Sequence, residues 1–137
     1  MLLSDNLYDL ARCRFEEAKI LLEKHKPDGA VYLCGYAVEL MLKRKIVHLL
    51  DWDGYPDTRT EFEGKQSFKI HDLDTLLHFS GLKKKLQSDN RMYARWQIAG
   101  VWKSEMRYKE LGKILESEAQ DILNATRDIL NFILKET

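Results

Sequence analysis

A chain of 137 residues is the size of one ordinary domain, and it can bury about two thirds of the surface that its unfolded form exposes. Lysine and arginine together number 22, as do aspartate and glutamate, so the overall charge indicates neither a nucleic-acid-coating nor a membrane-seeking surface. No apolar run approaches the roughly 20 residues of a membrane span, and the start MLLSDNLYDL lacks the regions of a secretion signal. We therefore expect one domain over residues 1–137, cytoplasmic and without a membrane partner.

The first half of the chain predicts two helices joined by a tight turn. Apolar residues recur at spacings of three and four, which predicts a helix over residues 4–26 with Ser4 or Asp5 as its N-cap. The sequence Pro-Asp-Gly then breaks the pattern, and Asp28 is expected to cap a second helix over residues 29–50. Because the connection is short, the two helices should pack antiparallel.

The next 20 residues, DWDGYPDTRTEFEGKQSFKI over 51–70, show no helical or strand period. A loop of this length is unusual inside a compact domain, and its four aromatic residues argue against disorder. Two interpretations stay open: a lid that packs back on the helices, or a gate or partner surface.

The second half of the chain predicts three further helical segments. Asp72 is a good N-cap for a short helix over 73–79, and another helix is expected over 82–99, interrupted near 88–90. Apolar residues at alternating steps of four and three from 115 to 133 predict the last helix. With no sustained period of two anywhere, the fold class is all-α, with four main helices and a short one.

The cysteines and histidines do not predict a metal centre. Cys13 and Cys34 lie inside apolar helical patterns without a CxxC spacing, so we expect two buried free thiols. No two histidines stand three or four residues apart with a carboxylate that completes a zinc set. We expect neither a metal nor a cofactor.

The second predicted helix contains a glutamate among apolar residues, in AVYLCGYAVELML. A helix that is apolar nearly all round is a central one, and Tyr32, Tyr36, Glu39 and Lys43 share its remaining stripe. Glu39 and Lys43, four residues apart, can form an ordinary ion pair if the stripe faces water. If the stripe faces a groove, the carboxylate needs Lys43, an arginine or a tyrosine hydroxyl as partner, and the stripe becomes a binding site.

Three stretches together resemble the HEPN domain superfamily, in the form common in small prokaryotic proteins. They are PDGAVYLCGYAVELMLKRKI over 27–46, KIHDLDTLL over 69–77 and WKSEMRY over 102–108. The resemblance implies a four- to five-helix up-and-down bundle with a long loop between the second and third helices. It also implies a homodimer, association with nucleotides or RNA, and a minimal nucleotidyltransferase as a partner in toxin–antitoxin or defence systems.

Many members of that superfamily are metal-independent endoribonucleases with an Arg-x(4–6)-His motif, and this sequence departs from the pattern. No histidine has an arginine at the required distance upstream; Arg44 and His48 come closest, with three residues between them, on the second helix rather than near the last. Ribonuclease activity by the family mechanism is therefore not expected. A non-standard site would need a base, an acid and a cation, roles that His71, Lys69, Arg107 and Tyr108 could fill, with His71 the weak catalytic candidate. The plainer interpretation of His71 is a helix-start residue whose ring bonds locally.

A local excess of positive charge lies between residues 81 and 107, where aromatic residues are interleaved with basic ones. This mixture is typical of phosphate contacts combined with base stacking, but it also fits tryptophans in the core and lysines on a solvated face. The candidate nucleic-acid patch consists of Lys83, Lys84, Lys85, Arg91 and Arg95.

We therefore expect a nucleotide- or RNA-associated binding module in which catalysis, if any, comes from a partner. Two alternatives stay open: a metal-independent endoribonuclease toxin around His71, and a domain that only docks another protein. The candidate ligand-binding residues are Tyr32, Tyr36, Glu39, Lys43, Arg107 and Tyr108.

Overall fold

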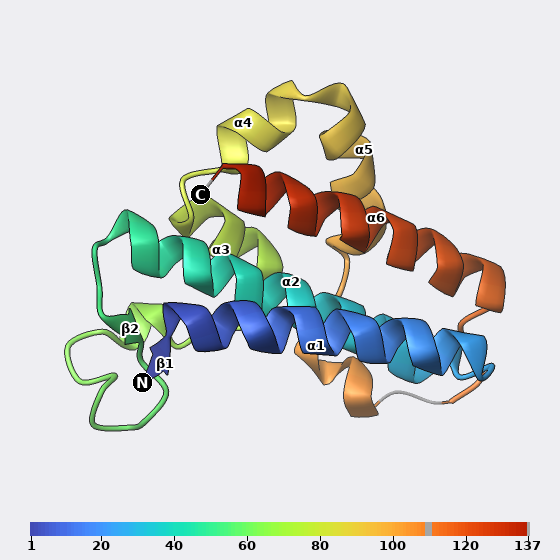
Figure 1. The fold of residues 1–137 in the computed structure, drawn as a ribbon, viewed down its shortest axis with the longest axis horizontal. Helices are drawn as coiled ribbons and strands as arrows, with labels where there is room; N and C mark the ends of the chain where they lie inside the picture. The colour runs from blue at the N-terminus through green and yellow to red at the C-terminus, as the bar shows by residue number, and fades with distance from the viewer. Residues whose placement is uncertain (109–110, 137) are drawn as a thin grey trace.

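The computed structural model describes residues 1–108 and 111–136, with the backbone alone for Arg107, and over these ranges the protein is a helical bundle (Figure 1). This confirms the all-α fold class. Three long helices, α1, α2 and α6, run alongside one another; α1 and α2 are antiparallel, and α6 runs in the direction of α2 (Figure 1). The long helices are α1 (Ser4–Glu23), α2 (Pro27–Leu49) and α6 (Glu116–Lys135). None of the described helices has both the length and the apolar character to cross a membrane.

Shorter elements fill the rest of the chain. The helix expected over 82–99 is two helices, separated at Asp89 within the predicted interruption. The short helices are α3 (Leu73–Phe79), α4 (Lys83–Ser88) and α5 (Asn90–Ala99), with 3-10 turns η1 (Gln66–Phe68) and η2 (Ser104–Tyr108). Two strands of two residues each, β1 (Leu2–Leu3) and β2 (Gly54–Tyr55), pair antiparallel.

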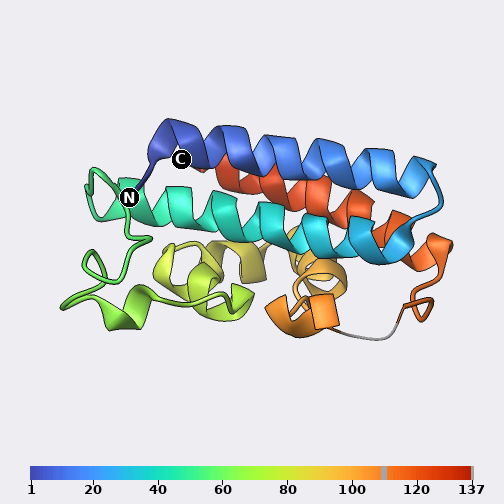
Figure 2. The same cartoon turned by 90° about the horizontal axis from the view of Figure 1, so that it is seen from below.

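Helix α2 is the centre of the bundle, as its nearly uninterrupted apolar sequence predicts. Helices α1 and α6 lie on one side of it, while α3, η2 and the segment before them lie on the other (Figure 2). Helices α4 and α5 pack outside this core, with α5 on α6. The arrangement buries α2 from Ala30 to Val47 over most of its circumference, which is what a helix with little polar surface requires.

Capping residues explain where the short helices begin. The Asp72 carboxylate accepts hydrogen bonds from the Thr75 amide at 3.0 Å and the Thr75 hydroxyl at 2.7 Å, so the predicted cap of α3 is confirmed. Asp89 does the same for α5 by accepting from the Met92 amide at 3.1 Å. Each carboxylate satisfies an amide that the first helical turn leaves without a backbone partner.

The predicted caps of the two long N-terminal helices are wrong. Helix α1 begins at Ser4 itself, and the Ser4 hydroxyl lies 2.6 Å from Nε2 of His48 instead of capping. Helix α2 begins at Pro27, so Asp28 lies inside its first turn, and its carboxylate accepts from the Gly112 amide at 2.9 Å. Proline suits a first helical position because the amide that it lacks would have no helical partner there.

The segment between α2 and α3 packs on the bundle, which agrees with the first of its two interpretations. The Tyr55 ring is fully buried, and its hydroxyl donates to the Phe68 carbonyl at 2.5 Å. The Trp52 ring meets the Phe68 ring edge-on, with centroids 4.9 Å apart. These aromatic contacts hold the two ends of the segment together, so it forms part of the fold rather than a free loop.

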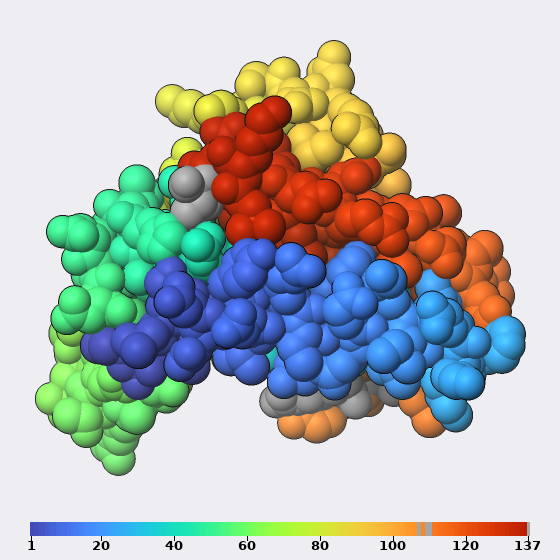
Figure 3. Space-filling view, viewed as in Figure 1, coloured from blue at the N-terminus to red at the C-terminus, as the bar shows by residue number. Residues whose placement is uncertain are grey.

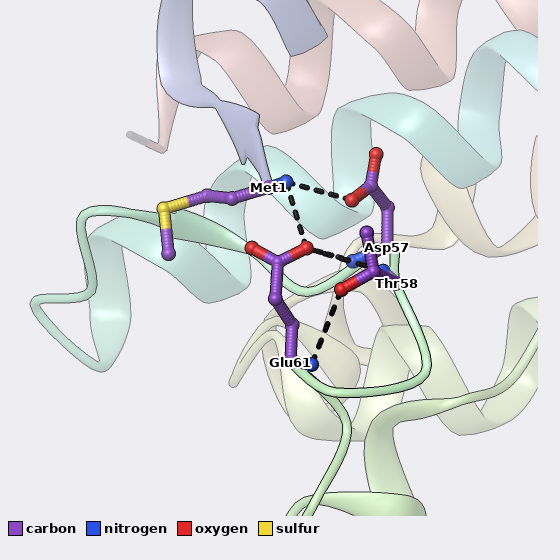
Figure 4. Close-up of polar contacts among 4 residues, drawn as sticks. All are labelled: Met1, Asp57, Thr58 and Glu61. Carbon is purple, nitrogen blue, oxygen red and sulfur yellow. Dashed lines mark hydrogen bonds and ion pairs between the residues drawn. The ribbon is translucent and has the colours of Figure 1, made fainter.

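The N-terminus adds a polar anchor to this segment. The Met1 ammonium group lies 2.7 Å from Oδ1 of Asp57 and 2.8 Å from Oε1 of Glu61, whose backbone amide bonds the Thr58 hydroxyl (Figure 4). Hydrogen bonds from the ammonium group lower the pKa of Glu61 to about 2, and bonds to Asp57 and Glu61 raise the pKa of the amine. The ammonium group and Asp57 are exposed and Glu61 is partly exposed, so the contact fixes position more than it contributes stability.

The expected burial of both cysteines is half right. Both thiols are free; Cys34 is buried, and burial raises its pKa to about 11. Cys13 is exposed, and its thiol donates to Oε1 of Glu17 at 3.3 Å. Residue 13 lies about 200° around the helix from Ala11, which belongs to the buried face of α1, so the position points away from the core.

Candidate functional site

The glutamate that the sequence singles out is buried. Glu39 is 2% exposed on α2, and the side chain of Lys43, one turn later, is 10% exposed. The Lys43 ammonium group donates to Oε2 of Glu39 at 2.9 Å. The predicted pair therefore exists, but its surroundings are protein rather than water, so the interpretation as an ordinary surface ion pair is wrong.

The imidazole of His71 is the third polar group at this site. Nδ1 of His71 lies 3.1 Å from the same Oε2 of Glu39, while the His71 side chain is 60% exposed. The expected local bond of this ring is therefore wrong, because its partner lies 32 residues earlier in the chain. A bond from Nδ1–H to the carboxylate leaves Nε2 as the lone-pair nitrogen of the neutral ring, available to another partner.

The backbone around His71 explains why the ring reaches the carboxylate. Asp72 caps α3 directly after it, and Leu73 is 1% exposed, so the start of α3 is fixed on both its polar and its apolar side. Helix α3 in turn packs on α2. The cluster thus joins α2 to the segment that enters α3, and we refer to Glu39, Lys43 and His71 as the polar cluster.

The second oxygen of the Glu39 carboxylate bonds neither Lys43 nor His71. Oε1 of Glu39 is buried and has no hydrogen-bond partner among the described residues. Two tyrosines lie close enough for the carboxylate to influence them: burial, and after it the charge of Glu39, raise the pKa values of Tyr36 and Tyr55. Both phenols therefore stay protonated at neutral pH. The Lys43 ammonium group lies 5.1 Å from the centre of the Tyr55 ring, a favourable cation–π distance.

Aromatic rings continue the site along α2. The Tyr32 and Tyr36 rings stack with centroids 6.4 Å apart, and the Tyr32 ring lies 5.9 Å from Trp102. A Cβ atom at Gly35 would come within 2.0 Å of the Trp102 indole, so the indole rests on bare helix backbone. Trp102 is buried, whereas both tyrosines are only partly buried and present ring surface beside the polar cluster.

The last two predicted ligand residues, Arg107 and Tyr108, belong to η2, which packs against α2. The Arg107 side chain lies outside the described residues. Tyr108 is 78% exposed, so its ring is not part of the core.

The predicted nucleic-acid patch lies on α4 and α5. Three of its five basic side chains form ion pairs with described acidic residues. Arg91 and Arg95 both contact Oδ2 of Asp128 on α6, at 3.4 and 2.8 Å, and Lys85 contacts Glu136. Trp96 and Trp102 are both buried, which agrees with the interpretation that placed the tryptophans in the core. The exposed charge that remains on this surface is smaller than the sequence count indicates.

The sequence does not predict three contacts of this site. His71 and Tyr55 lie near Glu39, and Trp102 packs on Tyr32 and Gly35. The sequence indicates His71 as an isolated histidine, Tyr55 as part of a loop, and Trp102 as a core residue or a base-stacking one. The glycine between Tyr32 and Tyr36 is a usable signal, since it indicates a close approach by another part of the chain.

No set of three or more histidine, cysteine, aspartate or glutamate side chains in the described part of the chain could hold a metal ion. Comparison of the chain with protein-family models, curated proteins and solved structures gave no match.

Proposed function

We propose that this protein is a cytoplasmic, homodimeric, HEPN-like helical module that binds a nucleotide, free or as part of an RNA strand. In this proposal it has no catalytic activity of its own and works with a partner such as a minimal nucleotidyltransferase, in a toxin–antitoxin or defence system. The observation that supports it is the exposed imidazole of His71, held by a buried carboxylate beside the half-buried rings of Tyr32 and Tyr36.

A buried charge cluster needs a reason beyond stability. Replacing a buried ion pair with apolar residues of similar volume is often neutral or stabilising, so stability does not by itself favour keeping Glu39 and Lys43 charged. The carboxylate orients the His71 ring, and a ring that carries protons on both nitrogens can donate from Nε2 to a phosphate oxygen. The cluster therefore has the chemistry of an anion receptor with one face in solvent.

The adjoining tyrosines supply the second half of a nucleotide site. Nucleobases stack on aromatic side chains with a gain of about 1–3 kcal/mol per base. Tyr32 and Tyr36 lie one turn apart on α2 and are both partly exposed, on the helix that also carries Glu39. A base on this pair and a phosphate at His71 would place a single nucleotide along one helical stripe.

Titration with ATP and GTP, followed by tryptophan fluorescence, tests this proposal because Trp102 lies against Tyr32. We expect saturable binding that His71→Ala weakens about tenfold, equivalent to about 1.4 kcal/mol. His78→Ala is the matched control, since His78 is an exposed histidine of α3 whose ring lies beside Phe79 rather than Glu39. Absence of binding, or equal weakening by the two variants, would refute the proposal.

A second candidate function has one observation in its favour. A carboxylate that orients an exposed imidazole is also the arrangement of a general acid–base group, as a metal-independent ribonuclease requires. Incubating a short RNA with the protein and separating the products on a gel distinguishes the two functions. Cleavage that His71→Ala abolishes and His78→Ala preserves would replace the binding-module proposal with the endoribonuclease.

A further inference from the structure

Trp102 occupies a slot on α2 beside the proposed nucleotide site. Its side chain is buried, although it belongs to the short link between α5 and η2 rather than to a helix. The indole rests on Gly35, where the bare backbone leaves room for the ring, and its centre lies 5.9 Å from that of Tyr32. Gly35 follows Tyr32 by three residues and precedes Glu39 by four, so all three share one face of α2. The indole therefore covers this face between the tyrosines and the polar cluster.

Two buried polar atoms at or next to this slot are unsatisfied. Nε1 of Trp102 and Oε1 of Glu39 have no hydrogen-bond partner among the described residues. Most buried donors and acceptors in folded proteins are paired, because an unpaired one costs free energy. Trp96 shows the usual arrangement, since its Nε1 donates to Oδ1 of Asp74 at 2.8 Å. Burial in the slot is therefore less favourable for Trp102 than its packing alone indicates.

The chain around Trp102 is attached to α2 mainly by packing. Lys103 lies 3.5 Å from Oδ1 of Asp72, but both side chains are exposed, so this ion pair contributes little stability. The Met106 amide donates to the Lys103 carbonyl at 3.0 Å, which is a local bond. Within the ranges that the structure describes, no backbone hydrogen bond joins residues 100–106 to α2. The indole, together with the partly buried Met106, is thus what holds this segment in place.

This segment can move without disturbing the long helices. It leads into η2, which packs on the side of α2 away from α6 and emerges below α1, outside the face that α1 and α6 form (Figure 3). Val101, directly before Trp102, is 59% exposed. An outward displacement of residues 100–106 therefore leaves the contacts among α1, α2 and α6 unchanged.

We propose that Trp102 is a lid on the nucleotide site, and that a ligand enters by displacing the indole from Gly35. With the indole in place, the Tyr32 ring already has Trp102 and Tyr36 as neighbours, at 5.9 and 6.4 Å. A base stacks on the Trp102 side of Tyr32 only after the indole leaves. Displacement also uncovers the Trp102 N–H, which then bonds to water. This inference rests on the proposed function and adds to it a closed, autoinhibited state.

Isothermal titration calorimetry with ATP and with GTP tests the lid. The apparent affinity of a site that must open first is reduced by the open fraction. For a lid that is open in about one tenth of the molecules, we expect Trp102→Ala to bind about tenfold more tightly than the unaltered protein. Trp96→Ala is the matched control, because it removes a buried indole that lies on α5, and it should leave the affinity unchanged. Circular dichroism confirms that each variant is folded.

Exchange of the indole N–H protons, followed by NMR, tests the same motion in the unaltered protein. We expect the Trp102 proton to exchange with solvent about tenfold faster than that of Trp96, which is bonded to Asp74, because local opening exposes it. Saturating ATP or GTP should make the exchange at Trp102 faster still, since the ligand keeps the indole out of its slot. This measurement needs no variant to fold.

The outcomes separate the lid from the proposed function. Nucleotide binding with exchange at Trp102 as slow as at Trp96, or slower in the presence of nucleotide, would overturn the lid and leave the binding site standing. A folded Trp102→Ala that binds no more tightly than Trp96→Ala would do the same. Absence of nucleotide binding by the unaltered protein and by Trp102→Ala would refute the proposed function, and the lid with it.

Discussion

Removing the ammonium group of Lys43 while keeping its aliphatic volume isolates the energetic role of the buried pair. In Lys43→Met, the Glu39 carboxylate stays buried but has His71 as its remaining hydrogen-bond partner. Breaking a buried pair in this way costs about 3–5 kcal/mol. Because the His71 ring is 60% exposed and brings water near the carboxylate, we expect the lower end, about 3 kcal/mol.

This cost converts to a clear shift in melting temperature. An unfolding entropy of about 2.1 cal/mol/K per residue over 137 residues gives about 290 cal/mol/K, so about 3 kcal/mol lowers the midpoint by about 10 °C. The double variant Glu39→Met/Lys43→Met removes both charges and should melt within about 4 °C of the unaltered protein. Thermal and denaturant unfolding followed by circular dichroism at pH 7 measure the midpoints and the free energies.

Two results with these variants would contradict the role given to the polar cluster. A destabilisation below about 1 kcal/mol in Lys43→Met would mean that water solvates the carboxylate and that the pair is not effectively buried. A double variant that is less stable than the single one would mean that the charged groups stabilise the bundle directly. In either case the argument that the polar cluster is kept for binding loses its basis.

Further predictions concern packing, thiol reactivity and pH. Gly35→Ala should destabilise the protein by about 3 kcal/mol, because a methyl group there overlaps the Trp102 indole. Denaturant unfolding measures this loss, and unchanged stability would contradict the observed packing. A thiol reagent at pH 8 should label the exposed Cys13 within minutes and Cys34 only after unfolding, since burial raises the pKa of Cys34 to about 11. Equal labelling rates of the two thiols in the folded protein would refute this prediction. The contact of the N-terminal ammonium with Glu61 should protect the amides of residues 57–61 from hydrogen exchange most between about pH 4.5 and 8. As the pH falls below this window, the Glu61 carboxylate, whose pKa is lowered to about 2, is progressively protonated and its contribution disappears. As the pH rises above it, the N-terminal amine, whose pKa is raised from 8.0, is deprotonated. Protection that does not change across the pH range would contradict the contact.

Much of the fold follows from local sequence signals, and the errors have local causes. The cap at Asp72 and the break at Asp89 are predictable because a short carboxylate bonds an amide three residues ahead in its own chain. Asp28 has the same chemistry and fails as a cap, because Pro27 already occupies the first position of α2. Its actual partner, the Gly112 amide, is 84 residues away and leaves no trace in local spacing.

In the candidate site, too, local contacts are predictable from the sequence and long-range contacts are not. The contact between Glu39 and Lys43 follows from helical geometry, since both residues belong to α2 four positions apart. Its burial and the contact with His71 depend on how the segment before α3 returns to α2, which no periodicity encodes.

The order in which contacts can form during folding follows from the same distances along the chain. Helices α1 and α2 pack through a turn of a few residues, so their pairing closes a short loop and can form early. The contact from His71 to Glu39 spans 32 residues, and the pairing of Leu2 with Tyr55 joins the beginning of the chain to its middle. We expect these long-range contacts to form late and to open first in native-state hydrogen exchange. The surface that we propose for nucleotide binding would then open more easily than the rest of the bundle. A ligand that contacts both α2 and His71 would slow this local opening before it raises the stability of the whole domain.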